Sequence, residues 1–205
     1  MVREKLAAGY SNGQWQPKGG YYTIEDGYKW LRQDNSPKVT WFNIVWSKLN
    51  TPKHAFNAWL IRHGRLLTLD RLSKMGITDQ STCYLCGLQD EDHDHLFRKC
   101  IYTCICYARL QSWLGIQGSG FGSAEQMLKL RHCSGFLRKL LCSLVVATHY
   151  HIWHARNICR VEQRVLHPKL IIQAVLEDGR LALLKYKYFQ ISQHDREWCN
   201  LRGLM

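Results

Sequence analysis

The hydrophobic positions of this chain recur with the spacing of α-helices. Between Thr51-Pro52 and Gly64, one helical face collects the apolar side chains Ala55, Phe56, Trp59 and Leu60. Threonine is a good cap there, and proline is tolerated at the first helical position because its missing N–H would have no partner anyway. A shorter helix is predicted from Thr68 to Gly76, and a further one opens at Thr23.

Longer helices are predicted further along the chain. From His95 to about Trp113 one buried stripe is expected, formed by Leu96, Phe97, Cys100, Ile101, Cys104, Tyr107 and Ala108. Ser123 with Gln126 forms a capping box for a helix to about His132, Ser134 opens one to about Leu166, and Pro168 begins a last one to about Phe189. The apolar stretch from Leu140 to Thr148 is too short for a bilayer, so it is expected to be a buried helix.

These elements predict a mainly α protein in three parts. Residues 1–20, rich in glycine, are expected to be a flexible lead-in. Residues 21–113 form the predicted central domain, and 114–205 form a helical carboxyl-terminal extension. The cluster at 41–46 is too short to be assigned to helix or strand by its periodicity.

Composition adds a strong positive charge. The 205 residues are 46% hydrophobic, which argues against disorder, and carry 28 Lys and Arg against 16 Asp and Glu, a formal charge of +12. The positive side chains lie on both sides of a short acidic stretch that contains Asp90, Glu91, Asp92 and Asp94. A nucleic acid, an anionic membrane surface or an acidic protein would each suit such a charge.

Nine cysteines would be an odd number for a disulfide framework. The first five residues lack the apolar run of a secretory signal, so reduced thiols and an intracellular location are expected, with nucleus or cytoplasm left open. Cysteine in this setting binds metal or fills the core.

A cysteine–histidine motif carries the most specific signal. Cys83 and Cys86 are two residues apart, and His95 and Cys100 follow within 18 residues of the first cysteine. This spacing predicts a Cys-Cys-His-Cys zinc knuckle inserted between the helices, with His93 as a competing ligand. Because protein would fill all four positions, one structural Zn²⁺ is expected. A redox pair would need a strand–helix–strand setting, and haem attachment would need histidine where Gly87 stands.

Other cysteines and histidines are weaker candidates. Cys104 lies on the predicted apolar stripe and is expected to be a packed core thiol. His149 and His151 would point about 200° apart on a helix, so only His151 and His154 share a side, and a metal role for them is not favoured.

The zinc knuckle and its acidic surroundings would be a poor phosphate cradle. Candidate phosphate contacts are therefore basic residues on its flanks, although each would also suit a solvated surface: Arg62, Arg65, Arg71, Lys74, Arg98 and Lys99.

Several ordered motifs together resemble a known family. They are Trp41 to Trp46, Pro52 to Leu60, Arg65 to Leu72, Gly76-Ile77, the Cys-x2-Cys pair, Glu91, Asp94 to Phe97, and Cys100. They resemble the reverse transcriptase zinc-binding domain of plant non-LTR (LINE-type) retrotransposons, over about residues 15–110.

The resemblance implies the metal ligands Cys83, Cys86, His95 and Cys100. Downstream, the segment from His151 to Asn157 looks like one that often follows this domain. Tyr84 and Tyr107 depart from the family, which usually has proline and tryptophan there, so they affect the expected packing but remove no ligand. A polymerase partner or a parent polyprotein is also implied.

Three functions follow from these features. The favoured one is a non-catalytic zinc-binding module that binds RNA or DNA through its basic flanks. The alternative is a protein-interaction or structural domain without nucleic acid. An enzyme is not expected, because the chain lacks the Asp-Asp pair of polymerases and a recognisable ribonuclease H carboxylate set. Its acid pairs, including Asp90-Glu91-Asp92 and Glu177-Asp178, are interpreted as caps or solvated loops.

Overall fold

The computed structural model describes residues 10–11, 14–15, 41–116, 134–185 and 191–205, and it divides the chain into two compact units, 1–39 and 40–205. In the first unit, strands β1 (Tyr10–Ser11) and β2 (Gln14–Trp15) pair antiparallel, with Tyr10 opposite Trp15. The predicted helices at Thr23 and Ser123 lie outside the described residues.

The described part of the second unit is helical. Its first three elements are α3 (Phe42–Val45), α4 (Pro52–Arg62) and α5 (Leu69–Lys74). The helix predicted at Thr51-Pro52 and its cap are confirmed, since the Thr51 side chain accepts a hydrogen bond from the His54 amide and Pro52 occupies the first helical turn. The predicted apolar face is wrong in part, because Phe56 is exposed and the buried positions of α4 include two polar residues, His54 and Asn57. The 41–46 cluster, left open by its pattern, forms α3.

The remaining helices are η1 (His95–Lys99), a π-helical turn, followed by α6 (Ile101–Leu114), α8 (Gly135–Glu162), α9 (Pro168–Lys185) and α10 (Gln193–Leu201). Ser134 caps α8 as predicted, by accepting from the Leu137 amide. The prediction that the helix at Pro168 is the last one is wrong. Ser192 accepts from the Asp195 amide and starts α10.

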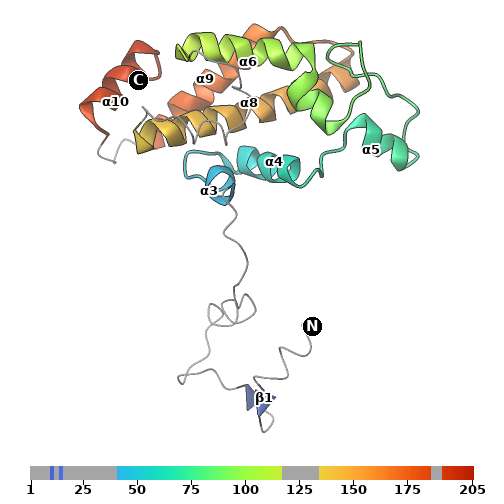
Figure 1. Ribbon diagram of the computed structural model, residues 1–205, viewed down its shortest axis with the longest axis horizontal. Helices are drawn as coiled ribbons and strands as arrows, with labels where there is room; N and C mark the ends of the chain where they lie inside the picture. The colour runs from blue at the N-terminus through green and yellow to red at the C-terminus, as the bar shows by residue number, and fades with distance from the viewer. Residues whose placement is uncertain (1–9, 12–13, 16–40, 117–133, 186–190) are drawn as a thin grey trace. The chain divides into compact units, whose positions relative to one another are not determined.

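Helix α8 is the centre of the second unit. Figure 1 shows α4 along one side of it and α6 and α9 along the other. The segment from Leu140 to Thr148 is buried at every position, which confirms the predicted buried helix. Within the described ranges, no helix combines the length and apolarity that a membrane crossing requires.

The predicted stripe of the 95–113 helix is only half right. Leu96, Phe97 and Cys100 are buried as expected, but Ile101 and Cys104 are exposed and Cys106 is buried instead. Cys100 has extended backbone angles (φ −60°, ψ 125°), so η1 and α6 are separate elements. The break rotates the buried face, and a single helical period cannot describe both segments.

Truncating a central α8 side chain is expected to destabilise the protein by creating a cavity. Leu140 is fully buried, so Leu140→Ala should lower the free energy of unfolding by about 2–5 kcal/mol. Val161→Ala is the matched control on the same helix, because Val161 is 80% exposed and its truncation should change stability by at most about 0.5 kcal/mol. Equal urea midpoints for the two variants would contradict this core assignment.

Candidate metal centre

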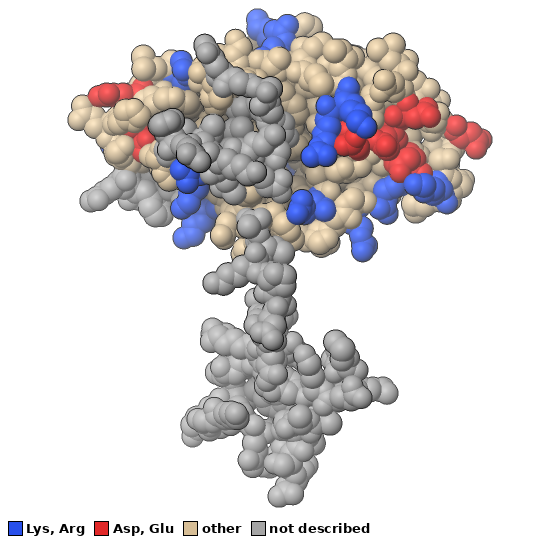
Figure 2. All heavy atoms as spheres, viewed as in Figure 1, with Lys and Arg blue, Asp and Glu red and all other residues tan. Residues whose placement is uncertain are grey.

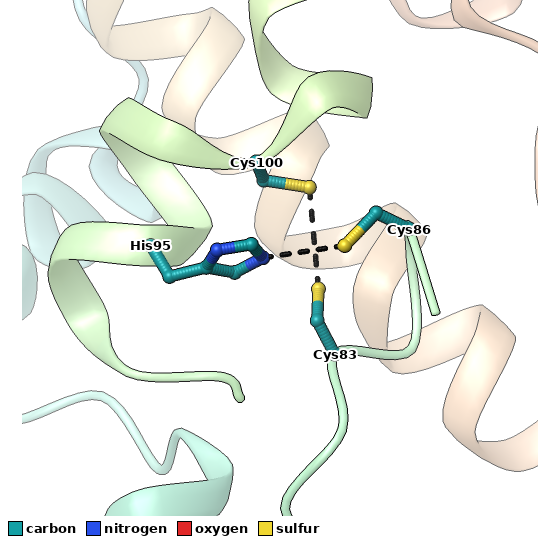
Figure 3. A group of neighbouring side chains, drawn as sticks. All are labelled: Cys83, Cys86, His95 and Cys100. Atoms are coloured by element: carbon teal, nitrogen blue, oxygen red, sulfur yellow. Dashed lines mark hydrogen bonds between the residues drawn. The ribbon is translucent and has the colours of Figure 1, made fainter. Parts of the chain in front are cut away.

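Three sulfurs and one imidazole meet at a common centre. The donor atoms of Cys83, Cys86, His95 and Cys100 all lie within 4.8 Å of one another (Figure 3). Cys83 Sγ is 4.0 Å from Cys100 Sγ, and Cys86 Sγ is 3.3 Å from His95 Nε2. Donors bound tetrahedrally to one zinc ion would be about 3.4–3.8 Å apart, given zinc–ligand bonds of about 2.0–2.3 Å. The observed separations fit one such ion.

The π-helical turn explains how His95 and Cys100 reach the same ion. On an α-helix, residues five positions apart point about 140° away from each other. Here the Cys100 amide donates to the His95 carbonyl, 2.7 Å away, which is the i→i+5 bond of a π-turn. The buried Thr103 hydroxyl donates to the Leu96 carbonyl, which connects the start of α6 to the π-turn.

A short loop presents the other two ligands. The Gly87 amide donates to the Cys83 carbonyl, and the Cys83 amide donates to the Gln89 carbonyl. Gly87 has φ +65°, a backbone angle that glycine adopts without the penalty of a Cβ atom. The turn therefore closes directly after Cys86, so that both sulfurs face the same point.

The imidazole of His95 is held by groups outside the ligand set. Its Nδ1 lies 3.1 Å from Gln89 Oε1, which leaves Nε2 directed at the sulfurs. The Asp92 carboxylate accepts from the His95 amide at 2.6 Å. Fixing the second ring nitrogen in this way orients a histidine for metal binding.

Two buried thiols of the cluster, Cys83 and Cys100, lie in contact with each other. A hydrogen bond from Cys83 lowers the pKa of Cys100 to about 5 and raises that of Cys83, and the Thr103 and Tyr102 amides at the start of α6 lower the pKa of Cys100 further. The contact thus favours the thiolate form of Cys100. A metal ion binds thiolates, so ion binding would release protons from the cysteines that still carry them.

A buried ion pair fastens this loop to α8. Glu91 and Arg156 are each 1% exposed, and Arg156 Nε and Nη2 lie 2.9 and 2.6 Å from Glu91 Oε1. The same oxygen accepts from the Leu69 amide at the start of α5. The interpretation of Glu91 as part of a solvated loop is therefore wrong, whereas the capping alternative agrees with its contact at the start of α5.

Tyr84 and Tyr107, where the chain departs from the family it resembles, both support the packing. The Tyr84 ring lies against the Arg156 guanidinium, 5.5 Å away, and its carbonyl accepts from the Cys159 thiol. Tyr107 is buried and packs against His149, whose pKa burial lowers to about 4.

The competing residues lie elsewhere. His93 packs on the Phe97 ring rather than joining the cluster. Cys104 was expected in the core but is exposed, with its thiol directed at the Arg98 carbonyl.

The six basic residues predicted to contact phosphate lie mostly on the surface, and several of them bind carboxylates or a backbone carbonyl of this chain. Arg98 and Lys99 both pair with Asp94, Lys74 pairs with Asp70, and Arg71 donates to the Gly64 carbonyl. Arg62 and Arg65 are exposed. Figure 2 shows acidic and basic side chains side by side over the end of the unit that carries α5.

Comparison with known proteins agrees with this geometry. Residues 22–106 match the family described as zinc-binding in reverse transcriptase, a range that includes all four clustered residues. No curated protein and no solved structure matches the chain. The match and the cluster together support a zinc-binding module, whose four donors lie close enough to hold one ion.

Losing one thiol of the cluster is expected to remove the metal. Cys83→Ser and Cys100→Ser should abolish the near-ultraviolet thiolate-to-metal absorption seen when Co²⁺ replaces zinc, because each removes a sulfur donor. They should also expose residues 77–113 to hydrogen exchange, since a structural zinc contributes on the order of 10 kcal/mol. Cys104→Ser, an exposed thiol outside the cluster, should retain both the absorption and the protection. Three indistinguishable spectra would disprove the assignment.

Neutralising the buried carboxylate is expected to detach the loop from α8. Glu91→Gln should cost about 3–5 kcal/mol of unfolding free energy, because Arg156 would remain buried without its counter-charge. Asp90→Asn is the matched control, since Asp90 is the residue before Glu91 and its side chain is exposed. Chemical denaturation measures both, and a Glu91→Gln protein as stable as the control would show that the pair is not needed.

Proposed function

We propose that this chain is a non-catalytic, zinc-stabilised module that binds nucleic acid. The observation that carries the proposal is the closed four-donor cluster of Cys83, Cys86, His95 and Cys100. Four protein ligands complete a tetrahedral zinc, so no position is left at that ion for a reacting water or substrate. Such an ion has a structural role, because it holds the Cys83–Cys86 loop and the turn from His95 to Cys100 together.

Charge supports a nucleic acid as the partner. The chain carries a formal charge of +12, and its exposed basic groups include Arg65 and, beside the metal centre, Arg98 and Lys99. Asp94 neutralises part of that local charge. Phosphates would have to compete with Asp94, so we expect moderate affinity and little base specificity.

A retroelement origin is the second part of the proposal. The family matched by residues 22–106 is described as zinc-binding in reverse transcriptase, and the sequence motifs resemble those of plant non-LTR elements. We infer that the module works beside a polymerase, as a partner or as part of one polyprotein. An upstream polymerase reading frame in the genome would support this origin, and an unrelated neighbourhood would argue against it.

Affinity for RNA and DNA oligonucleotides should fall steeply with salt. Fluorescence anisotropy should give a linear fall of log affinity with log salt, because neutralised phosphates release counterions. The double variant Arg98→Gln with Lys99→Gln should reduce the slope by about one per lost contact. Arg180→Gln, an exposed arginine on α9 paired with Glu177, is the control outside the candidate set.

A slope near zero would reject the nucleic-acid partner. Tight, salt-insensitive capture of a protein would favour the alternative, an interaction or structural domain. An unchanged slope in the double variant would show that the phosphate contacts lie away from Arg98 and Lys99. The proposal of a nucleic-acid partner would still stand.

A further inference from the structure

A second group of metal-ligand side chains lies away from the cysteine cluster. His54 comes from the first turn of α4, His151 from α8 and Asp178 from α9. One ligand atom from each lies within 4.8 Å of the others. Helical periodicity pairs His151 only with His154 of its own helix, whereas its neighbours in the fold come from two other helices.

Both imidazoles aim the same nitrogen at one carboxylate oxygen. His54 Nε2 is 3.5 Å and His151 Nε2 is 2.5 Å from Asp178 Oδ2. Two such donors on a tetrahedral zinc would be about 3.4 Å apart. The His54 separation already fits, and the His151 contact would need to open by about 1 Å, within reach of a side-chain adjustment.

The site is sheltered, and its surroundings favour the charged form of the carboxylate. The three side chains are 2%, 15% and 15% exposed, in the order His54, His151, Asp178. Burial pushes the pKa of Asp178 up, but the hydrogen bond from His151 and the nearby charges of His54 and Lys53 outweigh it and hold the pKa below its ordinary value. The Tyr150 ring, 4.7 Å from that of His54, covers one side.

We propose that His54, His151 and Asp178 form a second zinc site, with one coordination position left for water. Two imidazoles and a carboxylate are a donor set that zinc accepts, and the set has no sulfur, unlike the first site. His54 belongs to the range matched by the zinc-binding family, whereas His151 and Asp178 lie beyond it. The ion would therefore join the matched module to the carboxyl-terminal helices.

The two imidazoles could instead share only a proton with Asp178, and metal stoichiometry distinguishes the two cases. The full chain, equilibrated with Zn²⁺ and freed of loosely bound metal, should hold two zinc ions by elemental analysis. His151→Ala and Asp178→Asn should each hold one. His154→Ala is the matched control, an exposed histidine of α8 outside the cluster, and it should hold two.

Co²⁺ reports on the two sites separately. The thiolate absorption of the cysteine site should persist in both variants, while the visible bands of the second ion disappear. Persistence shows that each variant has folded, and the nearly isosteric Asp178→Asn keeps the test usable where His151→Ala does not fold. One zinc in the unaltered chain, or two in both variants, would overturn the second site without affecting the first.

Discussion

The meeting of three sulfurs with one imidazole is the constraint on which the arrangement of residues 83–100 depends. The Cys83–Cys86 loop and the π-turn from His95 to Cys100 are short, and neither could bury enough apolar surface to hold its own shape. A zinc ion offsets this by bonding to all four donors at once. The π-turn is a local departure from α-helical geometry that serves the same purpose, because it turns His95 and Cys100 toward one point.

The metal centre is also part of the core. Cys83 and Cys100 belong to the same hydrophobic cluster as the centre of α8, together with their neighbours in sequence Leu85, Leu96 and Phe97. The Glu91–Arg156 pair adds a polar connection, in which one carboxylate serves both the first turn of α5 and a guanidinium on α8. Such a pair contributes little net stability over an apolar contact, but it specifies one docking position, because any other would leave two charges buried and unpaired.

The chain as a whole is strongly basic, but the surface around the metal centre carries charges of both signs. The formal charge of +12 describes the whole sequence, whereas around the metal centre the basic side chains alternate with carboxylates. Asp94, for example, pairs with both Arg98 and Lys99. A long-range attraction to polyanions can therefore coexist with weak local contacts, and this combination is compatible with the nucleic-acid partner that we propose.

The sequence by itself determined much of this protein. Helical spacing with caps at Thr51 and Ser134 identified α4 and α8, because capping and periodicity act within one segment. The spacing of the three cysteines and His95 identified the candidate metal ligands for the same reason, since all four lie in one short window. The predicted buried face after Cys100 was wrong, because the π-turn from His95 to Lys99 interrupts the α-helical period on which that prediction was based.

Only the tertiary structure decided which distant groups meet. Glu91 looked like one more acid in a charged loop until α8 placed Arg156 against it, 65 positions away. His54, His151 and Asp178 are likewise brought together by the packing of three helices, and nothing in their separate surroundings indicates it. The physical reason is that local preferences act over one or two turns, whereas the pairing of buried charges and ligands is set by how whole helices pack.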